Sequence, residues 1–167
     1  SSDLLEAVDP AAFERAVEAL CNATMTIWYG LEGDSAYLAM SGAHKMIRSA
    51  LRAGAAASET DLSHRVNLVE KGDVVVVISQ SGRVETIAHI LHEVKARQIT
   101  IVGITSKIAS QLAGLADILL LTAARDVILG KLPLGLRAAQ PLLVDMLVLE
   151  VAARKGTVPL HFEADIY

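Results

Sequence analysis

The chain alternates short runs of apolar, β-branched residues with longer segments whose apolar positions recur every three or four residues. The clearest short run is Val74–Ile78, five consecutive apolar residues that follow the turn signal Gly72-Asp73. A run without polar alternation is typical of a strand buried on both faces of a sheet. We therefore predict a buried, parallel strand at this position.

A short hydroxyl-rich loop, Ser79-Gln80-Ser81-Gly82, follows this strand and leads directly into a predicted helix that ends near Arg97. Apolar residues at helical spacing mark that helix: Val84, Ile87, Leu91 and Val94. A loop between a buried strand and a helix N-terminus is suited to an anion, because amides, hydroxyls and the helix dipole all favour negative charge there. Arg83 could reach a phosphate held by this loop, although arginines in the first turn of a helix are mostly solvated, and the two interpretations weigh equally.

The same alternation extends over the rest of the chain. It predicts helices at 10–22, 36–52, 60–68, around 109–113 and at 135–154, and strands at 24–30, 99–104 and 117–121, with a further short strand or helix at 55–58. Pro141 predicts either a kink in the last helix or a late start to it. Alternating strands and helices specify an α/β fold, here a parallel five-stranded sheet flanked by helices in a flavodoxin- or Rossmann-like three-layer sandwich.

Two further hydroxyl-bearing loops follow predicted strands, Gly33-Asp34-Ser35 and Thr105-Ser106-Lys107. Ligands of such sheets bind at the carboxyl ends of the strands, near the point where the strand order switches. We therefore expect Ser35 to lie close to the loop at Ser79–Gly82, with a small anionic ligand between them.

Composition narrows the class of protein. Hydrophobic residues make up 53% and aromatic residues 4%, with a mean hydropathy of +0.44, so we expect an aliphatic core and apolar surface covered in an oligomer. The net charge of −4 argues against direct contact with nucleic acid. No apolar run approaches the roughly 20 residues of a membrane span, and no secretory signal is recognisable. A single cysteine, Cys21, excludes an internal disulfide and favours a cytoplasmic location.

Several of these motifs resemble the SIS (sugar isomerase) domain. They are the loop Ser79-Gln80-Ser81-Gly82 after a buried strand, the earlier loop Gly33-Asp34-Ser35, and the segment 105–117. The segment Arg137-Ala138-Ala139-Gln140-Pro141-Leu142-Leu143-Val144-Asp145 resembles the C-terminal helix of RpiR-family transcriptional regulators, in which an Arg, a Gln and an Asp recur at these spacings. The helix 13–22 is similar to the one that links the DNA-reading domain of that family to its SIS domain.

The resemblance implies one SIS domain over residues 1–167, with a linker or oligomerisation helix at 1–22, the sheet core and C-terminal helix at 23–155, and a tail at 156–167. It implies a non-catalytic sensor of a sugar phosphate, without metal or cofactor, in a homodimer or tetramer. DNA would be bound only through a helix-turn-helix domain outside this chain. The ligand residues implied by the resemblance and the loop chemistry are Gly33, Ser35, Ser79, Gln80, Ser81, Gly82, Arg83 and Thr86.

The loop departs from the family pattern in one way that bears on catalysis. Family members usually continue Gly-x-Thr and soon supply a Glu, whereas Val84 and Thr86 occupy those places and Glu85 is displaced by one residue. One helical residue turns a side chain by about 100°. Isomerases of this fold need a carboxylate or histidine to move a proton, and neither stands at the expected place, so a sugar-phosphate aldose–ketose isomerase is the second interpretation. A purely structural oligomerisation module is a third.

Other candidates have structural alternatives of their own. The three loop serines could simply cap helices, and carboxylates at Glu32 and Asp34 would repel a phosphate bound nearby. His89 and His92 share a helix face that could bind metal, but a solvated face is favoured. His44 and His64 could enter the pocket of a neighbouring subunit, although surface or core positions are favoured.

Overall fold

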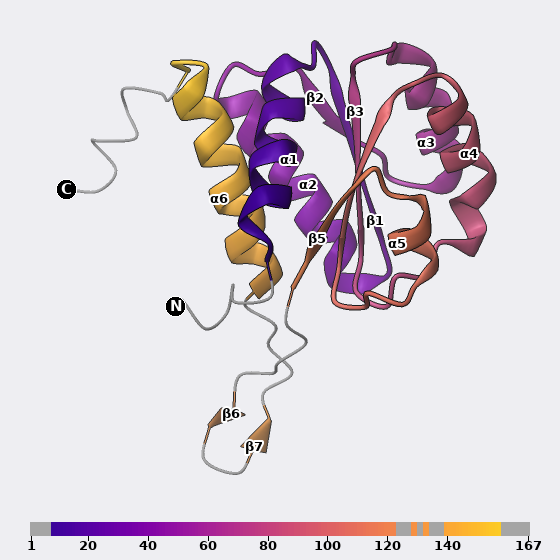
Figure 1. The fold of residues 1–167 in the computed structure, drawn as a ribbon, viewed down its shortest axis with the longest axis vertical. Coiled ribbons are helices and arrows are strands. Elements are labelled where there is room, and N and C mark those ends of the chain that lie inside the picture. Colours follow the sequence, from indigo (N-terminus) through magenta and orange to yellow (C-terminus); the bar gives the residue numbers. More distant parts are fainter. Residues whose placement is uncertain (1–7, 123–127, 130–131, 134–138, 158–167) are drawn as a thin grey trace.

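The computed structural model describes residues 8–122, 128–129, 132–133 and 139–157, and within them a five-stranded, all-parallel sheet. Its strands, in chain order, are β1 (Thr26–Leu31), β2 (Ala53–Ala55), β3 (Val74–Ser79), β4 (Thr100–Thr105) and β5 (Ile118–Leu121). The spatial order β2-β1-β3-β4-β5 places β3 at the centre of the sheet (Figure 1). From β1, the chain adds β2 on one side and β3, β4 and β5 on the other, so the strand order reverses between β1 and β3. This arrangement confirms the predicted α/β fold with a parallel five-stranded sheet. A separate two-stranded antiparallel sheet is formed by β6 (Ile128–Leu129) and β7 (Leu132–Pro133).

Helices cover both faces of the sheet and complete the three layers (Figure 1). The described helices are α1 (Pro10–Asn22), α2 (Gly33–Arg48), α3 (Glu59–Arg65), α4 (Ala88–Ala96), α5 (Gln111–Leu115) and α6 (Ala139–Arg154), with 3₁₀ turns η2 (Val66–Leu68) and η3 (Glu85–Ile87). Helices α1, α2 and α6 pack on one face of the sheet, and α3, α4 and α5 pack on the other. None of the helices in the described ranges is long and apolar enough to cross a membrane.

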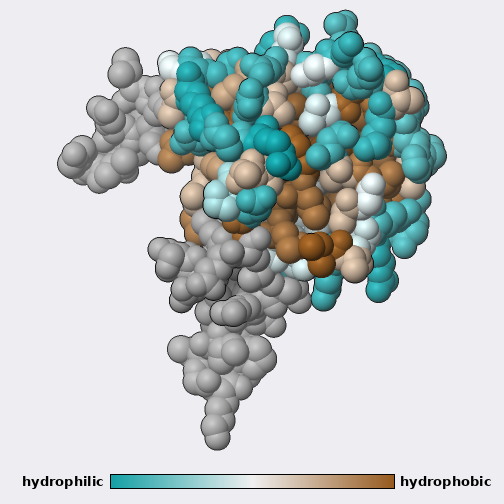
Figure 2. Space-filling model, viewed as in Figure 1, coloured by the Kyte–Doolittle hydropathy of each residue, from teal (hydrophilic) through white to brown (hydrophobic). Residues whose placement is uncertain are grey.

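The central strand joins two separate hydrophobic clusters. All six residues of β3 are buried, as predicted for a strand covered on both faces. Val76 packs in the cluster shared with α1, α2 and α6, whereas Val75 and Val77 pack in the cluster shared with α3 and α4. At the β5 edge the sheet is less covered, and apolar side chains gather over β5 on the face shown in Figure 2.

The single tryptophan fixes the distance between the sheet and α2. Trp28 is fully buried in β1, and a Cβ atom on Gly42 of α2 would come within 2.5 Å of its ring. The missing side chain at residue 42 therefore lets the helix lie directly on the indole. Since it is the only tryptophan, Trp28 also serves as a fluorescent reporter of this core.

The structure corrects several predicted boundaries. Helix α2 begins at Gly33 rather than 36, because positive φ angles at Glu32 (69°) and Gly33 (41°) turn the chain immediately after β1. It ends at Arg48 rather than 52, and Ala50 just beyond it has a positive φ of 59°. The residues predicted as a strand at 55–58 give β2 only as far as Ala55, since the Ala57 amide donates to Asp61 and Ser58 caps α3.

The helix predicted to start at Val84 also begins later than expected. Residues 82–84 are not helical, a 3₁₀ turn follows at Glu85–Ile87, and α4 starts at Ala88. The Val84 amide donates instead to the Gln111 side chain, at 3.1 Å. The loop after β3 therefore does not lead straight into an α-helix N-terminus, so that part of the expected dipole contribution is removed.

Pro141 lies near the start of the described part of the last helix, α6. Pro141 is the third residue of α6, in the first turn, where its missing N–H costs no intrahelical hydrogen bond. Arg137 of the RpiR-like segment and most of the predicted tail lie outside the described residues. The division into 1–22, 23–155 and 156–167 stays a prediction.

Candidate ligand-binding site

The register of two neighbouring strands brings the two predicted ligand loops to one edge of the sheet. Leu31, at the end of β1, pairs with Ser79, at the end of β3. The chain leaves β1 toward Ser35 and leaves β3 toward Gly82 from this common level. This is the carboxyl edge at the switch in strand order, the place where ligands of such sheets bind.

The first loop is a tight turn that presents the N-terminus of α2. A Cβ atom on Gly30 would lie 1.9 Å from the backbone carbonyl oxygen of Ser35, so only glycine permits this approach. The Ser35 amide donates to the Glu32 carbonyl at 3.0 Å, and the Ser35 side chain is buried, 4% exposed. The first amides of a helix have no intrahelical acceptor, so those of Gly33 and Asp34 are available to an anion.

The second loop is held together by its own serines. The Ser79 hydroxyl, fully buried, donates to the Arg83 carbonyl at 3.1 Å, and the Gly82 amide donates to the Ser79 carbonyl at 3.1 Å. The Ser81 hydroxyl oxygen accepts from the Arg83 amide at 3.3 Å, which leaves its proton for another acceptor. Ser79 therefore shapes the loop, and Ser81 remains able to donate to a ligand.

The second loop is also fastened to the start of α5. Gly82 has a φ of +74°, and a Cβ atom there would lie 2.2 Å from the hydroxyl oxygen of Ser110. Ser110 caps α5 by accepting from the Ala113 amide, and the Leu112 amide donates to the Gly82 carbonyl at 2.9 Å. Only a residue without a side chain fits between these groups.

The third loop, after β4, braces the second through Gln80. The Thr105 and Ser106 hydroxyls donate to the Gln80 carbonyl at 3.3 and 2.8 Å, and the Gln80 side-chain amide donates to the Ser106 hydroxyl at 3.3 Å. The side chain of Gln80 is thus turned along the edge toward β4. Sequence reasoning placed Thr105 and Ser106 at this edge but did not anticipate their bonds to Gln80.

A buried polar link continues from this edge into α6. The Gln140 side-chain amide donates to the Thr122 hydroxyl at 3.3 Å, and the Thr122 amide donates to the Thr105 carbonyl at 2.9 Å. Gln140 is 4% exposed and Thr122 is 2% exposed. The signal available in the sequence was the place of Gln140 in the segment that resembles the C-terminal helix of RpiR-family regulators, whereas nothing in the sequence singled out Thr122.

Charged and hydroxyl side chains surround the edge. Arg83 and Lys107 are exposed on the second and third loops, and Thr86 is exposed in η3. Glu32 and Asp34 are exposed beside the first loop. Two cations and two carboxylates therefore share this rim, and the carboxylates lie nearest to Ser35 in the chain.

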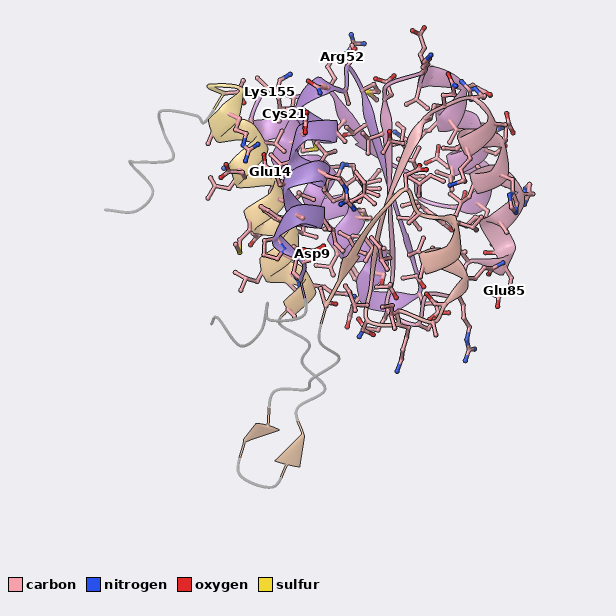
Figure 3. The ribbon with its side chains drawn as sticks, viewed as in Figure 1. Asp9, Glu14, Cys21, Arg52, Glu85 and Lys155 are labelled. Atoms are coloured by element: carbon pink, nitrogen blue, oxygen red, sulfur yellow. The ribbon has the colours of Figure 1, made fainter. Side chains whose placement is uncertain are left out.

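The single cysteine, Cys21, lies in the last turn of α1. Burial raises the pKa of the Cys21 thiol, which keeps it protonated near neutral pH and agrees with a packing role. The Lys155 ammonium donates to the Cys21 carbonyl at 3.0 Å, and both lie at the opposite end of α1 from Asp9 (Figure 3). Over the described part of the chain, no cluster of three or more His, Cys, Asp or Glu side chains is arranged to hold a metal ion.

Comparison with known proteins identifies the family. The model of the SIS domain matches residues 23–150, which include all five strands of the sheet. The chain belongs to the SIS domain family. The earlier resemblance to this family is therefore confirmed, and the match covers every residue of the three edge loops.

The curated relatives of this SIS domain are regulators of about twice its length. It is 29% identical over 152 residues to the HTH-type transcriptional regulator HexR of Pseudomonas aeruginosa, covering 89% of this chain and 52% of the relative. It is 28% identical over 154 residues to the uncharacterized HTH-type transcriptional regulator YbbH of Bacillus subtilis, covering 92% and 54%. The SIS domain thus spans about half the length of the curated relatives it matches.

Solved structures of an RpiR transcription factor domain, of the NanR protein and of a proposed isomerase share the fold. The sugar isomerase domain of an RpiR transcription factor from Sphaerobacter thermophilus has a TM-score of 0.77 at 23% identity, covering 99% of this chain and 92% of that one. NanR of Vibrio vulnificus, complexed with ManNAc-6P, has 0.78 at 24%, covering 99% and 65%. A proposed sugar-phosphate isomerase from Listeria monocytogenes has 0.77 at 20%, covering 93% and 82%. At these identities the likeness shows the fold alone.

Proposed function

We propose that this SIS domain binds a sugar phosphate at the β1–β3 edge and acts as the non-catalytic sensing domain of an RpiR-type transcriptional regulator. The observation that carries the proposal is the pairing of Leu31 with Ser79. It brings the N-terminus of α2, the Ser35 hydroxyl and the loop Ser79–Gly82 to one place. A phosphate needs several converging donors, and this edge supplies amides, hydroxyls and nearby cations.

The donors at the edge are sufficient for a metabolite sensor. Hydrogen bonds to a charged group contribute about 1.5–3 kcal/mol each, and a helix N-terminus adds roughly 0.3–1 kcal/mol. Three or four such contacts, from groups such as Ser35, Ser81 and the first amides of α2, reach the ~8 kcal/mol of micromolar affinity. Arg83 and Lys107, exposed at the rim, add attraction at longer range.

A sensing role is favoured over isomerisation by the chemistry of the loops. Aldose–ketose exchange needs a general base placed at the sugar carbon. The loop after β3 contains neither a histidine nor a carboxylate, and Glu85 is exposed in η3, beyond this loop. The regulators HexR and YbbH match most of this chain. The isomerase alternative keeps support from the Listeria structure, whose TM-score is comparable.

In the proposed regulator this domain does not touch DNA itself. With a net charge of −4 it lacks the basic surface of a nucleic-acid-binding domain. DNA binding would belong to a helix-turn-helix segment outside these 167 residues, in a cytoplasmic homodimer or tetramer.

A thermal-shift panel tests the proposal. The probes are ManNAc-6P, a set of aldose and ketose phosphates, the corresponding unphosphorylated sugars and inorganic phosphate. A ligand at 100 times its Kd stabilises by about 2.7 kcal/mol, which corresponds to a Tm rise of about 5–10 °C for a domain of this size. We expect at least one sugar phosphate to give this rise and the unphosphorylated sugars to give none.

Substitutions then locate the site. The double change Ser79→Ala with Ser81→Ala should abolish the rise, whereas Ser63→Ala, on the exposed surface of α3, should preserve it. A panel in which no sugar phosphate raises the Tm, or a rise that survives the double change, would contradict binding at this edge. Appearance of ketose phosphate from an aldose phosphate, followed by NMR, would favour the isomerase instead.

A further inference from the structure

One backbone carbonyl at the ligand edge accepts hydrogen bonds from three donors at once. It belongs to Gln80 in the second loop, and the donors are the Thr105 hydroxyl at 3.3 Å, the Ser106 hydroxyl at 2.8 Å and the Ser106 amide at 3.3 Å. All three donors come from the end of β4 and the loop that follows it. A carbonyl oxygen has two lone pairs, so these bonds use the acceptor fully and fix its direction.

The direction of this carbonyl sets the direction of the next amide. β4 lies on one side of β3 and β1 lies on the other, so the carbonyl points away from β1 (Figure 1). The peptide bond between Gln80 and Ser81 is trans, and the C=O and N–H groups of a planar trans peptide point in opposite directions. The Ser81 N–H is therefore turned toward the side of β1, where the first loop and the N-terminus of α2 lie.

The Ser81 amide has no acceptor within the described part of the chain. Its neighbours are paired: the Gly82 amide donates to the Ser79 carbonyl. The Arg83 amide donates to the Ser81 hydroxyl oxygen. Ser81 is half-buried, and a backbone N–H in such a place normally has a partner. A phosphate oxygen held between the first and second loops would supply one.

We propose that Ser106 is a positioning residue of the sugar-phosphate site: it holds the Gln80 carbonyl so that the Ser81 amide faces the phosphate. Thr105 has the same role from the end of β4. The inference rests on the proposed function, because it needs a phosphate at the β1–β3 edge. Neither hydroxyl has to touch the ligand, since each gives its single proton to the Gln80 carbonyl. Without these two bonds the peptide between Gln80 and Ser81 is able to rotate, and its amide loses its orientation.

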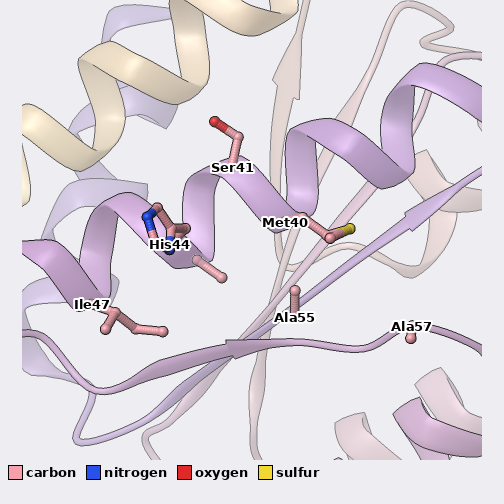
Figure 4. A pocket seen from close by; sticks show the side chains of 7 residues that line it. Met40, Ser41, His44, Ile47, Ala55 and Ala57 are labelled. Carbon is pink, nitrogen blue, oxygen red and sulfur yellow. The ribbon is translucent and has the colours of Figure 1, made fainter.

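A hollow between α2 and β2 is the other place where a phosphate compound could bind, and it is distinct from the edge. It has a volume of about 470 Å³ and is lined by seven residues, among them His44, Ile47 and Ala55. Figure 4 shows Ile47 of α2 directed toward the strand that carries Ala55. None of the seven is a lysine or arginine, and none lies in the loops after β3 and β4. Binding in this hollow would therefore not depend on Ser106.

Amide NMR spectra of the whole chain test the role of Ser106, with inorganic phosphate and the sugar phosphates of the thermal-shift panel as probes. In the parent protein we expect the Ser81 amide proton to move downfield on binding, because it gains a hydrogen bond to a charged oxygen. Ser106→Ala should abolish this shift and raise the Kd about tenfold. Thr105→Val combined with Ser106→Ala should raise the Kd about 100-fold. Ser106→Thr keeps the hydroxyl and should restore both the shift and the affinity.

Thr157→Ala is the matched control for the loss of a hydroxyl. The Thr157 hydroxyl also donates to a backbone carbonyl, that of Ala152 at 3.4 Å, but it does so just after the C-terminal end of α6. Its loss should lower the Tm of the free protein about as much as Ser106→Ala does, and it should leave the Kd unchanged. A loss of affinity that is confined to Ser106→Ala then reports orientation of the site rather than stability of the fold.

The outcomes distinguish this inference from the proposed function. A probe that moves the first amides of α2 but leaves the Ser81 amide in place would overturn the positioning role alone, and so would a probe that binds Ser106→Ala as tightly as the parent protein. The sugar-phosphate site would stand in both cases. Probes that move only the amides of His44 and Ile47, or no amide at all, would overturn the proposed function and the positioning role together.

Discussion

The backbone carbonyl oxygen of Ser35 lies 1.9 Å from the point that a Cβ atom on Gly30 would occupy. This contact presses the first turn of α2 against the end of β1. Since β1 ends level with β3 at Leu31 and Ser79, the absence of one side chain at residue 30 sets the position of Ser35 relative to the second loop. The geometry of this edge therefore depends on a glycine that is not among the proposed ligand residues.

Replacing this glycine should damage both stability and binding. We expect Gly30→Ala to lower the free energy of unfolding by about 1–3 kcal/mol, since backbone atoms of α2 must move to admit the methyl group. Urea unfolding followed by Trp28 fluorescence measures this loss, and the sugar-phosphate thermal shift should disappear with it. Gly114→Ala is the control: nothing lies within 4 Å of its Cβ position in α5, so alanine should be neutral or stabilising there. A Gly30→Ala protein as stable as the parent would refute the constraint.

A pair of glycines separates backbone strain from crowding. Gly82 (φ +74°) and Gly72 (φ +91°) both adopt the left-handed region, but only Gly82 has a neighbour, the Ser110 hydroxyl, 2.2 Å from its Cβ position. Both alanine substitutions introduce a strain of about 1–2 kcal/mol. Gly82→Ala should cost at least about 1 kcal/mol more, because overpacking adds to the strain, and should abolish the thermal shift. Equal losses of stability, measured by urea unfolding, would show that the Ser110 side chain moves aside without a cost in free energy.

The sheet and the location of the edge loops could be predicted because they depend on local patterns. The unbroken run Val74–Ile78 reports a strand buried on both faces, and the structure buries all of it. Once the strands were recognised as parallel, their carboxyl ends had to share one edge. The position of the loops at Ser35 and Ser79–Gly82 followed from that rule alone.

Features fixed by contacts between distant residues could not be predicted in this way. The start of α4 is delayed because the Val84 amide bonds to Gln111, 27 residues later in the chain. The short strand β2, Ala53–Ala55, has weak β propensity and is defined by its pairing with Thr26–Trp28. The bonds of Gln80 to the β4 loop and of Gln140 to Thr122 are of the same kind. Hydrophobic periodicity predicts which face of a helix or strand is buried, but it does not predict which distant polar group forms a hydrogen bond with that element.

The buried link between α6 and the edge makes a measurable contribution to stability. Gln140→Leu keeps a side chain of similar size but removes the N–H group that donates to the Thr122 hydroxyl. We expect a loss of about 1–2 kcal/mol in the free energy of unfolding, because a buried hydroxyl loses one of its partners. Asp145→Asn, on the exposed face of the same helix where Asp145 pairs with Lys45, is the control. It should change stability by at most about 1 kcal/mol. Equal losses in the free energy of unfolding for the two substitutions would show that the buried Gln140–Thr122 hydrogen bond contributes no more to stability than the exposed ion pair.

The ion pair between α1 and α6 should make stability depend on pH in a defined direction. Both Glu14 carboxylate oxygens accept from the Arg154 guanidinium at 2.6 Å, and Figure 3 shows Glu14 beside α6. The hydrogen bonds from Arg154 hold the pKa of Glu14 below its ordinary value of 4.5. A lowered pKa in the folded state means that the pair stabilises fully above the ordinary value, and that this contribution is lost as the pH falls through the lowered pKa.

Glu14→Gln measures this contribution directly. The variant should melt below the parent protein at neutral pH, and the two Tm values should converge as the pH drops below 4.5, the ordinary pKa of this carboxyl group. High salt at neutral pH should also narrow the gap, because the pair is exposed and screened. Glu18→Gln, on the same helix, is the control and should follow the parent at every pH. A gap of constant size from neutral to strongly acidic pH would mean that the carboxylate charge of Glu14 does not hold α1 against α6.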